Sequence, residues 1–282
     1  MAQILEGGPV AEALTKELIP RVDKLRQDGT VPCLAILRVG ERADDLAYEQ
    51  AALKRCEKAG IAAEQFVLPA EATQAQLMDT IEAINSDDSI HGCLMFRPLP
   101  KTLDEKAACA ALSPAKDIDG VTAGSMAKVY SGSGEGFSPC TAQSCMELLK
   151  HYGIDPSGKR AAVIGRSLVI GRPVAMLLMQ ANATVTLCHR KTRNMADIVR
   201  NAEIVVVAVG KAEAIGAEFF REGQTVLDVG INWSEAKQKL VGDVAFDAVE
   251  PLVGAITPVP AGVGSVTAAV LCKHVVEAAE KS

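Results

Sequence analysis

The sequence predicts an α/β protein of two domains, an N-terminal βα domain and a C-terminal doubly wound domain. Short apolar runs alternate with amphipathic stretches along the chain, which is typical of a mainly parallel sheet with helices on its faces. The 282 residues suit about two domains at ~150 residues each. A loop rich in Gly and Ser at 131–139 separates two runs of that alternation, so we place a domain boundary near it.

The elements of the first half are predicted from hydrophobic periodicity and from the glycines that end them. A short apolar strand at 33–40 closes on Gly40, and the helix that begins after it ends before Gly60, a typical C-terminal stop. Asp44 and Asp45 suit the N-terminus of that helix. We therefore expect helices at 9–27, 44–59 and 72–86, and strands at 33–40, 63–69 and 91–96.

The second half repeats the alternation with stronger signals. Its apolar runs are short and rich in Val, as buried parallel strands are. The last helix has no sheet partner of its own and is expected to return to the first domain. The expected strands are 161–165, 183–188, 203–210, 224–230 and 254–257, and the last helix is 265–281.

Composition excludes several classes of protein. The formal net charge is −6 and no basic block is present, which argues against a nucleic-acid partner. No apolar run reaches the ~20 residues of a membrane helix. The eight cysteines form no C-x-x-C pair and no zinc-site spacing, so we expect buried thiols, no metal site and a cytoplasmic protein.

A strand, a Gly-containing turn and a helix start occupy 161–173, which is where a doubly wound fold binds phosphates. The spacing of Gly165 and Gly171 does not match G-x-G-x-x-G, so this signal alone is weak. The next strand ends in Arg190 and Lys191 rather than the carboxylate that holds a ribose 2′-hydroxyl. Together with Arg166, these cations favour NADP over NAD. A solvated basic loop is the alternative reading, and His189 is expected to be structural.

Seven segments resemble the bifunctional methylenetetrahydrofolate dehydrogenase/methenyltetrahydrofolate cyclohydrolase family. They are PAKDIDG (114–120), SPCTA (138–142), VIGRSLVIGRP (163–173), TLCHRKT (186–192), DVGIN (228–232), GDV (242–244) and TPVPAGVGSVT (257–267). The resemblance implies a folate-binding catalytic domain (1–139 plus 258–282) and an NADP-binding Rossmann domain (140–257). It also implies tetrahydrofolate derivatives as substrates and a homodimer.

The resemblance carries over residue by residue. It implies that Tyr48 packs on the folate ring and that Asp119 accepts hydrogen bonds from the pterin. From the residues alone, packing as a half-buried side chain is the favoured role for Tyr48, whereas Asp119 is equally an Asx-turn residue before Gly120. The implied cofactor contacts are Thr141, Gly165, Arg166, Ser167, Ile231 and Thr267, to which we add Arg190. The implied substrate turn contains Pro260, Gly262 and Gly264.

The sequence departs from the family pattern at the expected catalytic positions. Ala52 stands where the family carries lysine, four residues after Tyr48, and Lys54 is too far round the helix to replace it. Phe96 stands at the family's glutamine position, and Arg97 follows on the opposite face by strand alternation. Ala261 replaces a turn glycine, and Ser265-Val266 replaces Pro-Met.

The departures affect two reactions unequally. Hydride transfer from 5,10-methylenetetrahydrofolate needs positioning, whereas hydrolysis of the methenyl product needs proton transfer. We therefore expect dehydrogenase activity with weak or lost cyclohydrolase activity. The alternatives are the full bifunctional enzyme, an oxidoreductase with another substrate and a non-catalytic NADP-binding protein.

Overall fold

The computed structural model describes all 282 residues, and the chain forms two compact units. The six-stranded unit contains Met1–Ala11 and Thr141–Thr267, and the three-stranded unit contains Glu12–Cys140 and Ala268–Ser282. These units place residues 1–11 and 258–267 with the six-stranded sheet, whereas the expected first domain was 1–139 plus 258–282. The reason at the N-terminus is that β1 (Gln3–Ile4) pairs in parallel with β11 (Ala255–Ile256) of the larger sheet.

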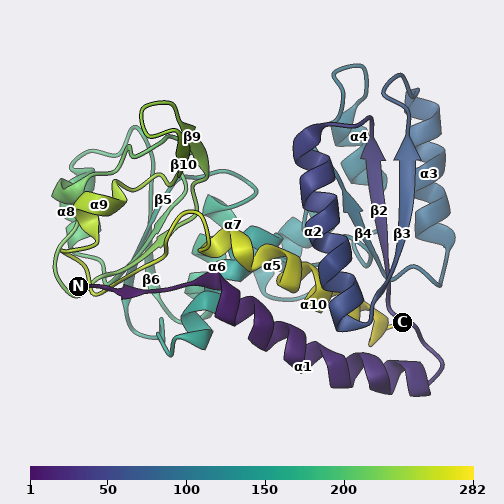
Figure 1. The fold of residues 1–282 in the computed structure, drawn as a ribbon, viewed down its shortest axis with the longest axis horizontal. Coiled ribbons are helices and arrows are strands. Elements are labelled where there is room, and N and C mark those ends of the chain that lie inside the picture. The colour runs from purple at the N-terminus through teal and green to yellow at the C-terminus, as the bar shows by residue number, and fades with distance from the viewer. The chain divides into compact units, whose positions relative to one another are not determined.

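The three-stranded unit is built on a parallel sheet with the order β3-β2-β4 (Figure 1). Its central strand is wholly buried and is apolar apart from Arg38. The odd-numbered side chains of that strand, Cys33 to Val39, pack with a helix that carries Leu77 and Ile81. The even-numbered ones lie on the other face, because successive side chains of a strand alternate. The strands are β2 (Cys33–Val39), β3 (Ala62–Leu68) and β4 (Gly92–Met95).

Helices surround this sheet. They are α1 (Gly7–Gln27), whose residues from Glu12 onward belong to this unit, α2 (Ala43–Ala59), α3 (Gln74–Ser86), α4 (Glu105–Ala111), α5 (Ala123–Ser131) and α10 (Thr267–Ala279). Asp44 and Asp45 lie in the first turn of α2, and Gly60 ends it in a left-handed conformation. Near its end, the chain lies against α1, where Arg21 Nη2 is 2.6 Å from Glu280 Oε2. The prediction that the last helix returns to the first domain is confirmed.

The six-stranded unit is a parallel sheet with the order β1-β11-β8-β7-β5-β6. Strand β5 has β6 on one side and β7 on the other, so the connections diverge at its carboxyl end. In doubly wound folds that switch point is where ligands bind. The remaining elements are β5 (Arg160–Ile164), β6 (Thr184–Cys188), β7 (Ile204–Val207), β8 (Thr225–Asp228), α6 (Cys140–His151), α7 (Gly171–Gln180), α8 (Met195–Arg200), α9 (Phe246–Val249) and the hairpin β9 (Asn232–Ser234) and β10 (Lys239–Val241), with two single 3₁₀ turns (Ala217–Phe219 and Val263–Ser265).

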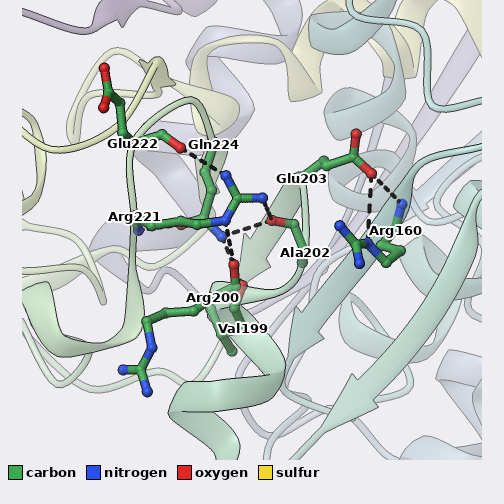
Figure 2. Close-up of polar contacts among 8 residues, drawn as sticks. All are labelled: Arg160, Val199, Arg200, Ala202, Glu203, Arg221, Glu222 and Gln224. Carbon is green, nitrogen blue, oxygen red and sulfur yellow. Dashed lines mark hydrogen bonds and ion pairs between the residues drawn. The ribbon is translucent and has the colours of Figure 1, made fainter.

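Polar side chains tie α8 to the opposite, amino-terminal edge of this sheet (Figure 2). Arg221 donates to the carbonyl oxygens of Arg200 and Ala202, at 2.6 and 3.3 Å. Gln224 Nε2 donates to the carbonyl oxygens of Val199 and Ala202 at 2.7 and 2.9 Å. These donors satisfy carbonyl groups that the end of a helix leaves unpaired.

The expected strands and helices are present with small shifts at their ends. The structure adds elements that the sequence did not reveal, namely β1, the hairpin β9–β10 and helices α4, α5, α6, α8 and α9. All eight cysteines are free thiols, and seven of them are buried. No α-helix combines the length and the apolarity that crossing a bilayer requires.

Candidate functional site

Tyr48 and Phe96 meet at the carboxyl edge of the three-stranded sheet. Their ring centroids are 5.9 Å apart and their planes are at 86°, an edge-on contact. Phe96 directly follows β4, and its N–H donates to the carbonyl oxygen of Leu37 at 2.9 Å. Tyr48 lies on α2, which follows β2, so two adjacent parallel strands bring both rings to one edge. Tyr48 is half-buried, whereas Phe96 is 8% exposed.

Ala52 lies one turn beyond Tyr48 on α2 and is completely buried. Its methyl group can neither donate nor accept a proton. Lys54 is exposed, as its position round the helix predicted, and does not replace the missing ammonium. Both positions at which the sequence departs from the expected family pattern, Ala52 and Phe96, therefore carry buried apolar side chains.

Asp119 is held in the loop that follows α4. The neighbouring Asp117 is fully buried and accepts hydrogen bonds from the N–H groups of Val121 and Thr122, at 2.9 and 2.7 Å. Gly120 has a φ of +67°, and a Cβ there would lie 2.5 Å from the nitrogen of Pro139. These constraints fix the loop, so Asp119 has a defined position.

Burial raises the pKa of the Asp119 carboxyl to about 6, against the opposing effects of the Arg97 charge and a Cys140 hydrogen bond. Arg97 Nη1 lies 3.9 Å from Glu105 Oε1 on α4, while Phe96 packs on Tyr48 of α2. The two side chains thus point in different directions, as alternation predicted. The sequence did not show that Arg97 nevertheless acts on Asp119.

Sequence reasoning also missed charged groups buried behind Tyr48. Arg38 and Glu49 form an ion pair of 2.9 Å, and their side chains are 10% and 2% exposed. A charged residue inside the apolar run CLAILRV was the available signal. A buried cation requires a partner, so Arg38 pointed to a carboxylate that the sequence alone does not identify.

In the six-stranded unit, the turn between β5 and α7 has the shape of a phosphate cradle. Gly165 has a φ of +125°, and a Cβ there would lie 2.1 Å from the carbonyl oxygen of Ala208. A Cβ at Gly171 would lie 2.1 Å from the oxygen of Gly165. Ser167 Oγ accepts from the N–H of Ile170 at 3.1 Å, and this turn leads into the N-terminus of α7. Backbone N–H groups at a helix N-terminus suit a pyrophosphate, so these residues fit a dinucleotide.

The end of β6 presents the cations that the sequence predicted. Arg190 and Lys191 are exposed, and so is Arg166 in the glycine turn. The N–H of Gly165 donates to the carbonyl oxygen of Cys188 at 3.0 Å, which ties the turn to this strand end. His189 Nδ1 accepts from the N–H of Lys191 at 3.2 Å, so its imidazole braces the turn, as expected of a structural residue.

The turn at 257–267 lies in the six-stranded unit. Gly262 is expected to permit a close approach of ligands, and a Cβ there would also lie 2.3 Å from the carbonyl oxygen of Pro258. The glycine is thus required by the turn itself. Ala261, which replaces a family glycine, adopts a φ of +78°. A Cβ at Gly264 would lie 3.1 Å from Ile231 Cδ1.

The remaining predicted positions lie beside these turns. Pro260 follows a cis peptide bond. Thr267 Oγ1 donates to the carbonyl oxygen of Gly264 at 2.9 Å. Ile231 is 58% exposed. Thr141 lies in the first turn of α6 and is half-buried.

Two buried carboxylates fix the loops that follow β7 and β8. Asp243 accepts from the N–H groups of Val209, Gly210 and Lys211 at 2.6, 2.9 and 2.8 Å. Asp228 accepts from three further N–H groups, including that of Asp243, and burial raises its pKa to about 6. The sequence motifs contained both residues but did not reveal this bracing role.

Comparison with known proteins gives matches over nearly the whole chain. Residues 5–119 match the family model "Tetrahydrofolate dehydrogenase/cyclohydrolase, catalytic domain". Residues 139–282 match "Tetrahydrofolate dehydrogenase/cyclohydrolase, NAD(P)-binding domain". The "Bifunctional protein FolD" of Carboxydothermus hydrogenoformans is 50% identical over 281 residues, which cover 99% of this chain and 98% of that protein.

Solved structures of FolD proteins superpose on this chain over nearly its whole length. The bifunctional FolD of Campylobacter jejuni superposes with a TM-score of 0.95 at 36% identity, covering 100% of this chain and 99% of that chain. A Trypanosoma brucei FolD, solved with NADP cofactor and inhibitor, gives a TM-score of 0.90 at 35% identity, covering 99% of this chain and 98% of that chain.

Proposed function

Since the chain belongs to the tetrahydrofolate dehydrogenase/cyclohydrolase family, we propose that it oxidises 5,10-methylenetetrahydrofolate to 5,10-methenyltetrahydrofolate with NADP. The observation that carries the proposal is the pair Tyr48 and Asp119 on one unit combined with the glycine turn on the other. Tyr48 offers a ring on which the pterin stacks, and Asp119 offers two carboxylate oxygens to its amino-pyrimidinone edge. Hydride transfer depends mainly on such positioning.

The proposed cofactor is NADP, which supplies the hydride acceptor when bound. The turn from Gly165 to Gly171 receives the pyrophosphate, and Ser167 and the start of α7 stabilise its charge. Arg166, Arg190 and Lys191 bind the 2′-phosphate, because guanidinium and ammonium groups make charge-assisted hydrogen bonds to phosphate oxygens. Thr141, Ile231 and Thr267 complete the proposed cofactor contacts.

We further propose that cyclohydrolase activity is weak or lost. Attack of water on the methenyl cation requires proton transfer, for which a positioned acid or base is worth about 10²–10⁴-fold. Ala52 offers no such group and has no exposed surface. Phe96 packs against Tyr48 at the position of the family's glutamine. Full bifunctionality, as in the relative from Carboxydothermus hydrogenoformans, is the competing function.

Two assays on the purified protein test both parts of this proposal. NADPH formation from methylenetetrahydrofolate is expected, with a much lower rate when NAD replaces NADP. Hydrolysis of methenyltetrahydrofolate is expected to stay near the spontaneous rate. Hydrolysis as fast as dehydrogenation would contradict the loss, and absence of NADPH formation would favour another substrate or a non-catalytic NADP-binding protein.

Variants at positions 52 and 96 test whether these residues cause the loss of hydrolysis. Ala52→Lys alone is expected to gain little, because Phe96 would still desolvate the ammonium. The double variant Ala52→Lys/Phe96→Gln restores both polar groups and is expected to raise hydrolysis by about tenfold or more. Lys54→Ala on the exposed side of the same helix is the matched control and is expected to change neither reaction.

We also propose a homodimer in the cytoplasm. Trp233 and Leu240 face each other across the β9–β10 hairpin and are 55% and 39% exposed. Apolar side chains gathered on a surface support a protein partner, here a second copy. The eight free thiols support a reducing compartment.

A further inference from the structure

The buried face of α2 consists of three small side chains and two carboxylates, with no large apolar side chain. Its buried residues are Asp45, Glu49, Ala52, Cys56 and Ala59. Helices are usually fixed by side chains that interlock as ridges and grooves. Alanine and cysteine offer little to interlock, so Glu49 is the one long side chain that reaches from this buried face.

Glu49 is held by two side chains of the sheet. Arg38 Nε donates to Glu49 Oε2 at 2.9 Å, and Arg38 Nη1 donates to the carbonyl oxygen of Gly40 at 2.6 Å. Gln65 Nε2 donates to Glu49 Oε1. Gln65 on β3 is the partner of Ile36, two residues before Arg38, so both donors project from the same sheet face. Both carboxylate oxygens of Glu49 are therefore bound.

This network is an unusual way to stabilise a helix on a sheet. Arg38 is 9% exposed and Glu49 is 1% exposed. Replacing a buried ion pair by apolar residues of similar volume is often neutral or stabilising, because desolvation offsets the attraction. The best-attested benefit of buried polar groups is that they select one register among several.

We propose that the Arg38–Glu49–Gln65 network is a positioning element that fixes the rotation of α2 about its axis and thereby directs Tyr48. Tyr48 immediately precedes Glu49 on the helix. Side chains extend about 5–6 Å from a helix axis, so a rotation of about 20° moves them by about 2 Å. An error of about 1 Å in the placement of a substrate can cost about 10²-fold in rate. The network acts on the reaction only through Tyr48, so this inference rests on the proposed function.

The double variant Arg38→Met/Glu49→Leu tests the network without leaving a buried charge unpaired. It is expected to keep its thermal midpoint within a few degrees of the parent protein. Its kcat/KM for methylenetetrahydrofolate should fall by about tenfold or more, while its KM for NADP stays within about twofold. A folded double variant that keeps kcat/KM for the folate within twofold of the parent would overturn the proposal.

Glu12→Gln is the matched control. Glu12 also binds α2, through Arg55 at 3.1 Å and Lys58 at 2.5 Å, but its side chain is 44% exposed. Removing these two ion pairs of an exposed carboxylate is expected to change neither kinetic constant. Should the double variant fail to fold, Gln65→Leu removes one donor and leaves Arg38 paired. It is expected to lower kcat/KM for the folate by threefold or more, and parental kinetics in that variant would equally overturn the proposal.

A spectroscopic readout separates this inference from the proposed function. The chain has three tyrosines, so ¹⁹F spectra of protein labelled with 3-fluorotyrosine contain three signals, and Tyr48→Phe assigns one of them. Tyr48 lies edge-on to Phe96, so rotation of α2 should shift or broaden its signal in the double variant and not in Glu12→Gln. If the signal shifts but the parent protein has no folate dehydrogenase activity, the proposed role of the network is supported and only the proposed substrate is refuted. An unchanged signal would refute the proposal that the network fixes the rotation of α2.

Discussion

Replacing Asp119 by Asn should make the protein more stable, and the gain should depend on pH. Burial raises the pKa of this carboxyl from 3.8 to about 6 in the folded chain. The folded state therefore binds more protons than the unfolded state between these two values. The contribution of Asp119 to stability is greatest below pH 3.8 and is lost as the pH rises to about 6.

The magnitude follows from the pKa difference of about 2.2, which is about 6 minus 3.8. At 1.36 kcal/mol per pKa unit, the ionised Asp119 costs about 3 kcal/mol at pH 7.5. At pH 5.0 the cost is only about 1.6 kcal/mol, because the folded carboxyl is then mostly protonated. The stability gained by Asp119→Asn should therefore be about 1.4 kcal/mol larger at pH 7.5 than at pH 5.0.

Urea unfolding of both proteins at the two pH values measures this difference. Asp228, whose pKa is also raised to about 6, titrates in both proteins, so its contribution cancels. Trp233 is the single tryptophan and belongs to the six-stranded unit, so its fluorescence transition serves as an internal control. A gain in stability that is equal at both pH values would refute the reasoning. The variant should also raise the KM for the folate, because it lacks the carboxylate.

The other predictions concern the six-stranded unit. Gly165→Ala should abolish NADP binding and lower the thermal midpoint, because its Cβ meets backbone at 2.1 Å. Gly158→Ala is the control, because Gly158 has a φ of +73° and a Cβ there would meet no atom within 4 Å. It should lower the free energy of unfolding by only about 1 kcal/mol. Arg190→Ser should raise the KM for NADP by about tenfold and leave the KM for NAD nearly unchanged. Equal increases in the two KM values would show that Arg190 does not bind the 2′-phosphate. Trp233→Glu should shift sedimentation toward the monomer, whereas an unaltered profile would exclude the hairpin from the dimer contact.

The sequence predicted those parts of the structure that depend on local patterns. Val-rich runs identified β5, β7 and β8, and Gly60 marked the end of α2. The strands of the β9–β10 hairpin span three residues each, which is too short for an alternation to be visible. Strand β1 spans two residues and exists only because β11 pairs with it.

Sequence reasoning selected candidate residues where a residue type implies a role and missed residues whose contacts depend on a distant partner. Tyr48, Phe96 and Asp119 were identified by motif, and the first two make contact. Neither Arg38 nor Glu49 carries any local sign that the other is its partner, because the strand and the helix meet only in the folded unit. The motif singled out Gly262 for a close approach of ligands, and the structure adds a reason within the turn, where a Cβ would lie 2.3 Å from the carbonyl oxygen of Pro258.

The position of α10 determines when the first half of the chain can complete its fold during synthesis. His274 on this helix donates through Nδ1 to the carbonyl oxygen of Ile118 at 2.8 Å, in the loop that holds Asp119. Residues 268–282 leave the ribosome after the entire six-stranded unit. A nascent chain therefore carries the earlier-made residues 12–140 without their final helix while the second unit forms. Translation interrupted near residue 267 would leave a complete six-stranded unit and a three-stranded unit without α10, in which the apolar surface that α10 covers is exposed to aggregation.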